Sequence, residues 1–286
     1  MEKKKKENIV LVPTDFTLVA DFAIDHAAGI AKCLDGKVAI LHVINKETKS
    51  FLKKENLGEE AIEEKLKAIA ETVEKKHNVK LEYIAREGSI FKTIAEVTEE
   101  IGARIVVMGT HGKIGVQHLV GSFALKVIES SPVPVIVVQE RDFAKGYKNI
   151  VLPIDETSES KQKVNWAIHI AKIFNSTIHL FGVKYSDELQ MNEVERNISQ
   201  IKNILSKAGI KYTDKISADA HSNFGKSINV YGDYIKADLV MIMTNPHQLL
   251  PSFMLSPWAE QVIFNTSKIP AMCVNPVDLD ITYVSF

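Results

Sequence analysis

An internal repeat limits what this chain can fold into more than any other feature of its sequence. Residues 149–155 (NIVLPID) repeat residues 8–15 (NIVLVPTD), and Asp155 lies 140 positions after Asp15. Four further segments recur at a similar distance: 37–43 in 177–183, 59–77 in 193–205, 103–110 in 237–244, and 127–138 in 262–274. A repeat of this length is a globular domain rather than a solenoid unit. The sequence therefore predicts two copies of one domain, residues 8–140 and 148–277, joined by a polar stretch.

Apolar strands alternate with helices inside each copy. In the first copy we expect strands at residues 8–13, 37–43, 81–85, 105–108 and 132–138, and helices at residues 20–34, 59–77, 90–100 and 123–130. Parallel strands need right-handed crossover connections, which place helices on both faces of the sheet. The alternation therefore predicts an α/β fold with a mostly parallel sheet in each copy.

A glycine-rich loop follows the fourth of these strands. Glycine lets backbone N–H groups approach an anion closely, and the free N–H groups at the start of a helix point toward it. The groups that could bind a phosphate in this stretch belong to Gly109, His111, Gly112, Lys113, Gly121 and Ser122. A tight turn without a ligand is the alternative for the glycines, an exposed loop pair is the alternative for the histidine and the lysine, and a helix N-cap is the alternative for the serine.

Segments far apart in the sequence are expected to meet at one edge of the sheet. Ligands of such sheets bind beyond the carboxyl ends of the strands, where the strand order reverses. Asp15, Val43 and Gly109 each stand at such an end. Their convergence favours a ligand-binding crevice in the first copy, although Asp15 also suits a helix N-cap or a turn.

The second copy has lost the glycines of this loop. Met243 stands at the position of Gly109, and its Cβ restricts the backbone there. The other replacements are Pro246 for Gly112 and Ser256-Pro257 for Gly121-Ser122. Because proline has no N–H to donate, we expect no phosphate binding of this kind in the second crevice.

A second phosphate-loop pattern occurs in residues 220–227 (AHSNFGKS). The repeat aligns it with residues 86–93, where the chain turns into a helix. The next strand ends in Met243-Thr244 rather than in an aspartate that could hold Mg²⁺. We therefore expect a structural turn at residues 220–227.

The glycine spacing and its surroundings resemble the universal stress protein family, here as a tandem of two domains. The family has Gly, two residues, Gly, nine residues, then Gly followed by Ser or Thr. This chain has Gly109, Gly112 and Gly121-Ser122, with eight residues in the second gap. The stretches MGTHGK and GSFALKVIESSPVPVIVV also resemble the family, and the resemblance covers residues 8–276.

The resemblance implies a five-stranded, Rossmann-like sheet that binds ATP, with or without Mg²⁺. Asp15 would contact the adenosine, the backbone of Val43 would meet adenine, and the glycines with Ser122 would hold ribose and phosphates. The remaining members of the expected site are Thr14, His111, Lys113 and Phe123. The resemblance also implies that the two halves pair through their last strands, residues 134–138 and 270–274, and it allows a homodimer.

The net charge, the lengths of the apolar runs and the spacing of cysteines and histidines argue against several classes of function. A formal net charge of −1 gives no field that favours nucleic acid or an anionic membrane. No apolar run approaches the ~18 residues that a membrane span needs, and the basic run at residues 3–6 suits a solvated tail rather than a signal peptide. The two cysteines, Cys33 and Cys273, lack metal or redox spacing and the nine histidines are scattered, so we expect no metal site and a cytoplasmic protein.

The sequence thus predicts a stress-response protein that binds ATP or a related adenine nucleotide in its N-terminal domain, with the second domain as its partner. No set of residues suits catalysis, so we do not expect an enzyme. Two alternatives stay open. One is an interaction protein that needs no nucleotide, and the other is a slow nucleotide hydrolase, for which Asp15 is the candidate metal-binding carboxylate.

Overall fold

The computed structural model describes residues 7–110, 118–244 and 257–276. Domain 1 comprises β1 (Ile9–Pro13), α1 (Leu18–Cys33), β2 (Lys37–Ile44), α2 (Lys46–Lys54), α3 (Glu60–His77), β3 (Lys80–Glu87), α4 (Ile90–Glu100), β4 (Ile105–Gly109), α5 (His118–Ser130) and β5 (Val135–Val138). Domain 2 comprises β6 (Asn149–Ile154), η1 (Glu159–Lys161), α6 (Val164–Phe174), β7 (Thr177–Lys184), α7 (Glu188–Lys207), β8 (Lys211–Ala220), η2 (His221–Asn223), α8 (Phe224–Tyr234), β9 (Leu239–Met243), α9 (Pro257–Ile263) and β10 (Ala271–Val274).

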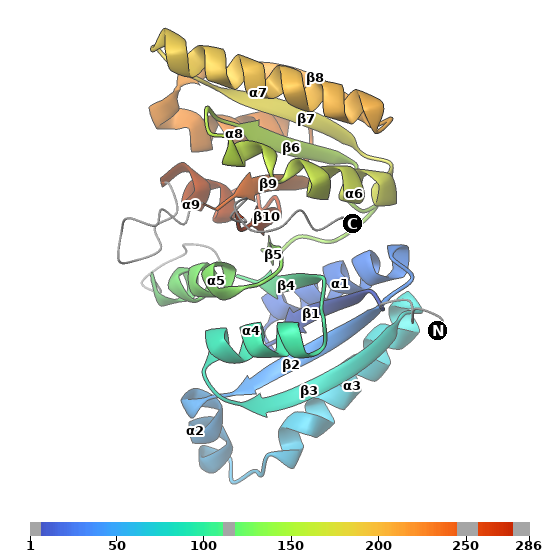
Figure 1. The fold of residues 1–286 in the computed structure, drawn as a ribbon. Coiled ribbons are helices and arrows are strands. Elements are labelled where there is room, and N and C mark those ends of the chain that lie inside the picture. Colours follow the sequence, from blue (N-terminus) through green and yellow to red (C-terminus); the bar gives the residue numbers. More distant parts are fainter. Residues whose placement is uncertain (1–6, 111–117, 245–256, 277–286) are drawn as a thin grey trace.

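All ten strands of the described chain form one sheet, in the order β3-β2-β1-β4-β5-β10-β9-β6-β7-β8 (Figure 1). The strands within each domain are parallel. In domain 1, α1 packs against α3 and α4 packs against α5, and in domain 2 α8 packs against α9. The predicted α/β fold of two tandem domains is confirmed.

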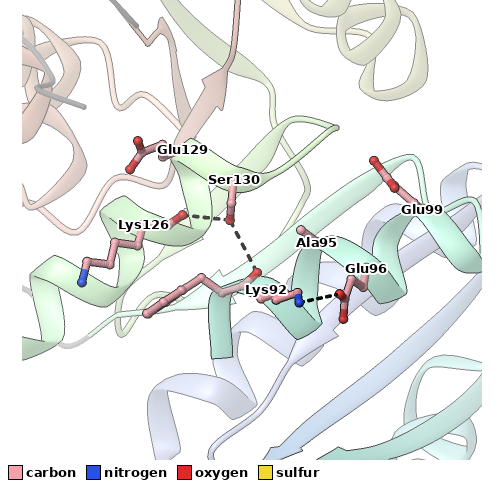
Figure 2. Close-up of a pocket in the computed structure, with 8 residues that line it drawn as sticks. Lys92, Ala95, Glu96, Glu99, Lys126, Glu129 and Ser130 are labelled. Atoms are coloured by element: carbon pink, nitrogen blue, oxygen red, sulfur yellow. Dashed lines mark hydrogen bonds and ion pairs between the residues drawn. The ribbon is translucent and has the colours of Figure 1, made fainter. Parts of the chain in front are cut away.

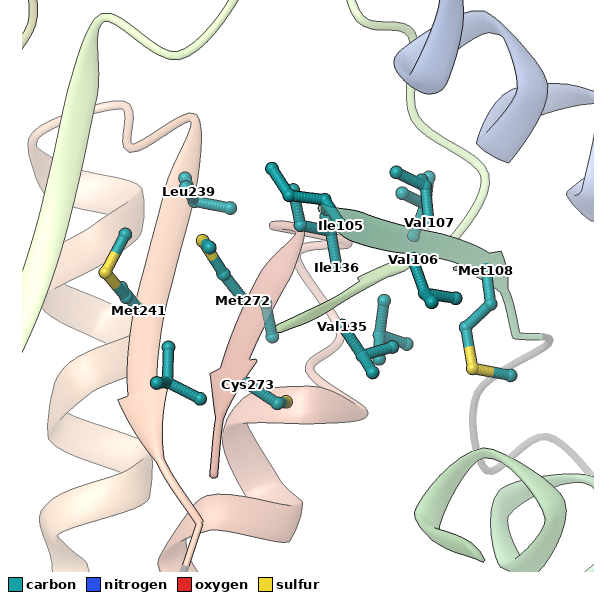
Figure 3. Packing of buried hydrophobic residues seen from close by; sticks show 14 of the residues in the cluster. Ile105, Val106, Val107, Met108, Val135, Ile136, Leu239, Met241, Met272 and Cys273 are labelled. Atoms are coloured by element: carbon teal, nitrogen blue, oxygen red, sulfur yellow. The ribbon is translucent and has the colours of Figure 1, made fainter. Parts of the chain in front are cut away.

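The two domains pair through their last strands, the candidates that the family resemblance offered for this contact. Strands β5 and β10 are antiparallel, and Met272 lies opposite Ile136 in their register. Both side chains are buried, and Figure 3 shows them among apolar residues of β4, β5, β9 and β10. The hydrophobic cores of the two domains therefore join across this seam. The edges that β5 and β10 would otherwise expose are covered by each other.

The segment that links the domains is also held by a buried hydrogen-bonded pair. The ring Nε2–H of His26 on α1 donates to the carbonyl of Arg141 at 2.9 Å, and the hydroxyl of Tyr147 donates to Nδ1 at 3.0 Å. This assignment follows from the carbonyl, which can only accept. Burial lowers the pKa of His26 to about 4. The imidazole is therefore neutral near pH 7 and ties α1 to the linker.

Two helices differ from the expectations. The helix expected at residues 123–130 begins at His118, so Gly121 and Ser122 lie inside its first turns rather than before them. In the sequence Val120 stands at helical spacing from Ala124 and Val127, and this spacing extends the apolar face past the glycine. Helix α2 was not predicted, and the described part of domain 2 has no α-helix between β7 and α7.

Candidate functional site

Three neighbouring strands of domain 1, β1, β2 and β4, end at the same edge of the sheet, where the sequence analysis expected a crevice. The strand order reverses at β1, which lies between β2 and β4, and this is the place where α/β sheets bind ligands. The structure brings together four predicted residues at these strand ends: Thr14, Asp15, Val43 and Gly109. The predicted residues His111, Gly112 and Lys113 lie outside the described residues. Phe123 lies on α5, where it is 38% exposed and stacks on Phe91 with ring centroids 6.2 Å apart.

A side-chain turn fixes the loop after β1. Oδ1 of Asp15 accepts hydrogen bonds from the backbone N–H of Thr17 at 3.0 Å and from its hydroxyl at 2.6 Å. In domain 2, Asp155 makes the same two bonds to Thr157 at 3.0 and 2.6 Å. The aspartate therefore has a structural role in both domains. In domain 1 it is exposed, and Oδ2 takes no part in the turn.

The residue after Asp15 packs its side chain against residues of β2 and α3. Phe16 adopts a left-handed backbone with φ of 63°. Its ring stacks on His42 with centroids 4.4 Å apart, and the ammonium of Lys65 lies 4.3 Å from the ring centroid. Nδ1–H of His42 donates to the carbonyl of Thr14 at 2.8 Å, and burial lowers the pKa of this imidazole. These contacts hold the β1 loop against β2 and α3.

The backbone of β2 continues past the end of β1. The N–H of Thr14 donates to the carbonyl of Leu41 at 2.8 Å, and β1 pairs with β2 only up to Pro13. Alternate residues of a strand direct their backbone groups to the same side, so those of Val43 face the space beyond the end of β1. A peptide donor and an acceptor are therefore available to a flat, polar ligand at this position.

Gly109 has a packing role that the sequence did not reveal. A Cβ on this residue would lie 2.7 Å from the carbonyl oxygen of Val19 and 3.0 Å from the nitrogen of Ala20, both in the first turn of α1. Met243 occupies the same place in domain 2, where α6 begins only at Val164 and a short 3₁₀ turn, η1, precedes it. Because Gly109 has no side chain, α1 can begin directly over the end of β4.

The residue after Gly109 carries a buried hydroxyl that has no partner among the described residues. Thr110 is 1% exposed, and among the described residues nothing bonds to its Oγ1. Thr244 in domain 2 donates from Oγ1 to Oδ1 of Asn275 at 2.5 Å. The residue of domain 1 that corresponds to Asn275 is Gln139, which donates its amide instead to the carbonyl of Asn265 at 2.9 Å. Buried polar groups are rarely left unpaired in folded proteins. Among the described residues, Oγ1 of Thr110 shares this state with Oδ1 of Asn197 and of Asn229 in domain 2, and of the three it is the one that follows directly on Gly109 at the end of β4.

Domain 2 contains a buried lysine just before α6 that the sequence analysis missed. Lys163 is 2% exposed, and its ammonium donates to the carbonyl and the hydroxyl of Ser160 at 2.8 and 3.3 Å. Burial lowers its pKa to about 8. The repeat places Ala23 at this position in domain 1, and that contrast is the signal that could have identified the residue.

The stretch of residues 220–227 is a turn into α8. The hydroxyl of Ser227 donates to Asp219 at 2.7 Å and to the carbonyl of Asn223 at 3.1 Å. A Cβ on Gly225 would lie 2.7 Å from the carbonyl oxygen of Trp258 on α9. Both groups are committed to internal contacts, which agrees with the structural turn expected there.

A separate groove of about 520 Å³ lies between α4 and α5 (Figure 2). Phe91 lines this groove, and the repeat aligns Phe91 with Gly225 of domain 2. The hydroxyl of Ser130 on α5 donates to the carbonyl of Phe91 at 3.5 Å and to that of Lys126 at 2.9 Å. The groove lies between two helices rather than at the strand ends, so it is distinct from the crevice.

Comparison with known proteins gives a consistent result for both halves. The model of the Universal stress protein family matches residues 8–139 and 146–275. Universal stress protein MJ0531 of Methanocaldococcus jannaschii is 35% identical over 144 residues, which cover 46% of this chain and 81% of that protein. Universal stress protein G of Escherichia coli O157:H7 is 31% identical over 143 residues, which cover 46% of this chain and 97% of that protein.

A solved structure shares the arrangement of the whole chain. The universal stress protein from Archaeoglobus fulgidus DSM 4304 superposes with a TM-score of 0.75 at 19% identity, covering 95% of this chain and 97% of that one. This similarity concerns the fold alone. Because the family model matches both halves, this chain belongs to the universal stress protein family as a tandem of two of its domains.

Proposed function

We propose that domain 1 binds an adenine nucleotide such as ATP at the ends of β1, β2 and β4, and that domain 2 serves as its structural partner. The buried hydroxyl of Thr110, which has no hydrogen-bond partner in the part of the chain that the structure describes, carries the proposal. A buried polar group without a partner costs about 1–3 kcal/mol, and a ligand that offers a hydrogen bond removes this cost. At the equivalent position of domain 2 the hydroxyl of Thr244 is already paired with Asn275, so this particular group of domain 2 does not call for a ligand.

The other groups at the crevice suit the parts of a nucleotide. The backbone N–H and C=O of Val43 face the space beyond β1 and can pair with the edge of adenine. Oδ2 of Asp15 can accept from a ribose hydroxyl while Oδ1 keeps the turn. We assign the phosphates to the glycine loop, with Gly112, Lys113 and His111, and to the start of α5. Mg²⁺ would arrive with the phosphates and neutralise part of their charge.

Calorimetric titration with Mg-ATP tests this assignment with two matched variants. Thr110→Val keeps the shape of the side chain but removes the hydroxyl, so we expect about tenfold weaker binding, the effect of one lost hydrogen bond to a polar ligand. Thr244→Val makes the same change in domain 2 and should leave the affinity unchanged. Equal affinity in both variants would place the ligand elsewhere. Absence of any heat with the unaltered protein would favour an interaction protein that needs no nucleotide.

We propose no catalytic role for this site. A hydrolase would need a carboxylate free to hold a metal ion beside the phosphates, and Asp15 was the candidate for it. Its Oδ1 already accepts two hydrogen bonds from Thr17, as Asp155 does from Thr157 in the other domain. The hydrogen bonds of the turn explain why both copies have this aspartate, so no catalytic role is needed to account for it.

We also propose residues 8–140 and 148–277 as the bounds of the two domains.

The cellular compartment and the oligomeric state are further proposals. Within the described ranges no helix combines the length and the apolar character that a bilayer span requires. Both cysteines are free thiols, which suits the reducing cytoplasm that we propose. A homodimer would have to use surfaces other than β5 and β10, such as the outer edges of β3 and β8.

A further inference from the structure

Domain 2 has a hollow at the ends of three of its strands. It measures about 530 Å³ and lies at the carboxyl ends of β6, β7 and β8. In domain 1 the chain leaves β2 and forms α2, whose Lys49 bonds to Glu87 at the end of β3 at 2.5 Å. In domain 2 the chain passes from β7 to α7 through three residues only, numbered 185–187. The missing helix leaves the strand ends open.

An aromatic pair and a carboxylate form one wall of this hollow. The rings of Tyr185 and His221 stack with centroids 5.0 Å apart and planes inclined by 19°. The hydroxyl of Tyr185 donates to Oε2 of Glu156, and burial, together with this negative partner, raises the pKa of the phenol. The repeat places Phe16 where Glu156 stands and Asn45 where Tyr185 stands. The charged and aromatic wall therefore belongs to domain 2 alone.

A second carboxylate faces the hollow from the start of α7. Oδ1 of Asp187 accepts from the backbone N–H of Gln190 at 2.9 Å, which caps the helix. Oε1 of Glu156 and Oδ2 of Asp187 make no hydrogen bond or ion pair with any described residue. Both residues line the hollow, so these acceptor oxygens are available to a ligand. Among the described residues that line it, Lys184 is the one lysine or arginine, and it is exposed.

We propose that this hollow, the Tyr185 pocket, binds a small organic cation that carries a primary ammonium group. The two carboxylates attract a cation and repel an anion. An aromatic face attracts cations as well, and a phenol that donates to a carboxylate gains electron density, which strengthens this attraction. The capped start of α7 offers no free N–H group at Gln190 for an anion. The pocket stands apart from the nucleotide crevice, and its occupant does not depend on nucleotide binding.

Calorimetry with two probes of equal length tests the charge preference. Butane-1,4-diamine carries two ammonium groups, and succinate carries two carboxylates on a chain of the same length. We expect heat of binding with the diamine and none with succinate. Binding of succinate in preference to the diamine would overturn the proposal, as would the absence of heat with the diamine.

Single substitutions test whether the diamine binds in the Tyr185 pocket. Glu156→Gln removes the carboxylate and should weaken diamine binding at least tenfold, whereas Glu195→Gln removes an exposed carboxylate farther along α7 and should leave it unchanged. Tyr185→Phe keeps the ring but loses the bond to Glu156, and we expect about threefold weaker binding. Circular dichroism shows whether each variant is folded. Equal weakening by Glu156→Gln and Glu195→Gln would mean attraction by overall charge and would contradict a built pocket.

Discussion

Gly109→Val is expected to abolish nucleotide binding and to lower the free energy of unfolding by about 2–3 kcal/mol. A Cβ at this position would lie 2.7 Å from the carbonyl oxygen of Val19, and the backbone of a helix cannot move aside as a flexible side chain can. Helix α1 would have to shift away from β4 or lose its first turn. The loop with Asp15 precedes that turn, so the crevice would change shape along with it. Urea unfolding and titration with Mg-ATP measure the two effects.

The control lies at the equivalent position of the second domain. Met243→Val shortens a side chain where the backbone already accommodates a Cβ, and domain 2 starts its helix at Val164. We expect it to leave nucleotide affinity within about twofold, with a smaller loss of stability of about 1 kcal/mol. Gly109→Val with unchanged affinity would show that the first turn of α1 does not shape the site. A loss of affinity in both variants would mean a general effect on folding.

The repeat made most of the fold predictable, because each half repeats the same order of strands and helices. Buried parallel strands read as short apolar runs, so β1, β2 and β4 were located to within a residue or two from sequence alone. Helix α2 was missed since only Leu52 of its residues is buried, which leaves a weak apolar pattern. The start of α5 was missed because Gly121 was interpreted as a boundary, whereas a helix tolerates glycine at a modest cost.

The location of the candidate site could be predicted from the sequence, but the packing and hydrogen-bonding roles of its residues could not. Strand ends in a parallel sheet converge by topology, so Asp15, Val43 and Gly109 could be placed together. The packing of Gly109 on α1 depends on the distance between two backbones, which no spacing of residues reveals. The contrast between Thr110 and Thr244 depends on Asn275, which lies far from Thr244 in the sequence and near it only in the folded chain.

Acid is expected to destabilise the protein through His26, by up to about 3 kcal/mol between pH 6.5 and pH 4. The folded-state pKa of about 4 lies below the ordinary value of 6.5, because burial disfavours the charged imidazole. Well above pH 6.5 the histidine is neutral in both the folded and the unfolded state, so it has no effect on the free energy of unfolding. As the pH falls toward 4, the unfolded chain binds a proton that the folded protein does not bind, so the free energy of unfolding decreases. Urea unfolding at several pH values measures this slope.

His26→Gln separates this histidine from the others. Glutamine does not titrate, so the variant should lose about 3 kcal/mol less than the unaltered protein over the same pH range. The difference between the two proteins is the relevant quantity, since burial also lowers the pKa values of His42, His169 and His179, which add to the slope in both. His77→Gln, which changes a histidine paired with Asp25, should leave the difference in place. Parallel pH curves for His26→Gln and the unaltered protein would mean that the bond between α1 and the linker opens without cost.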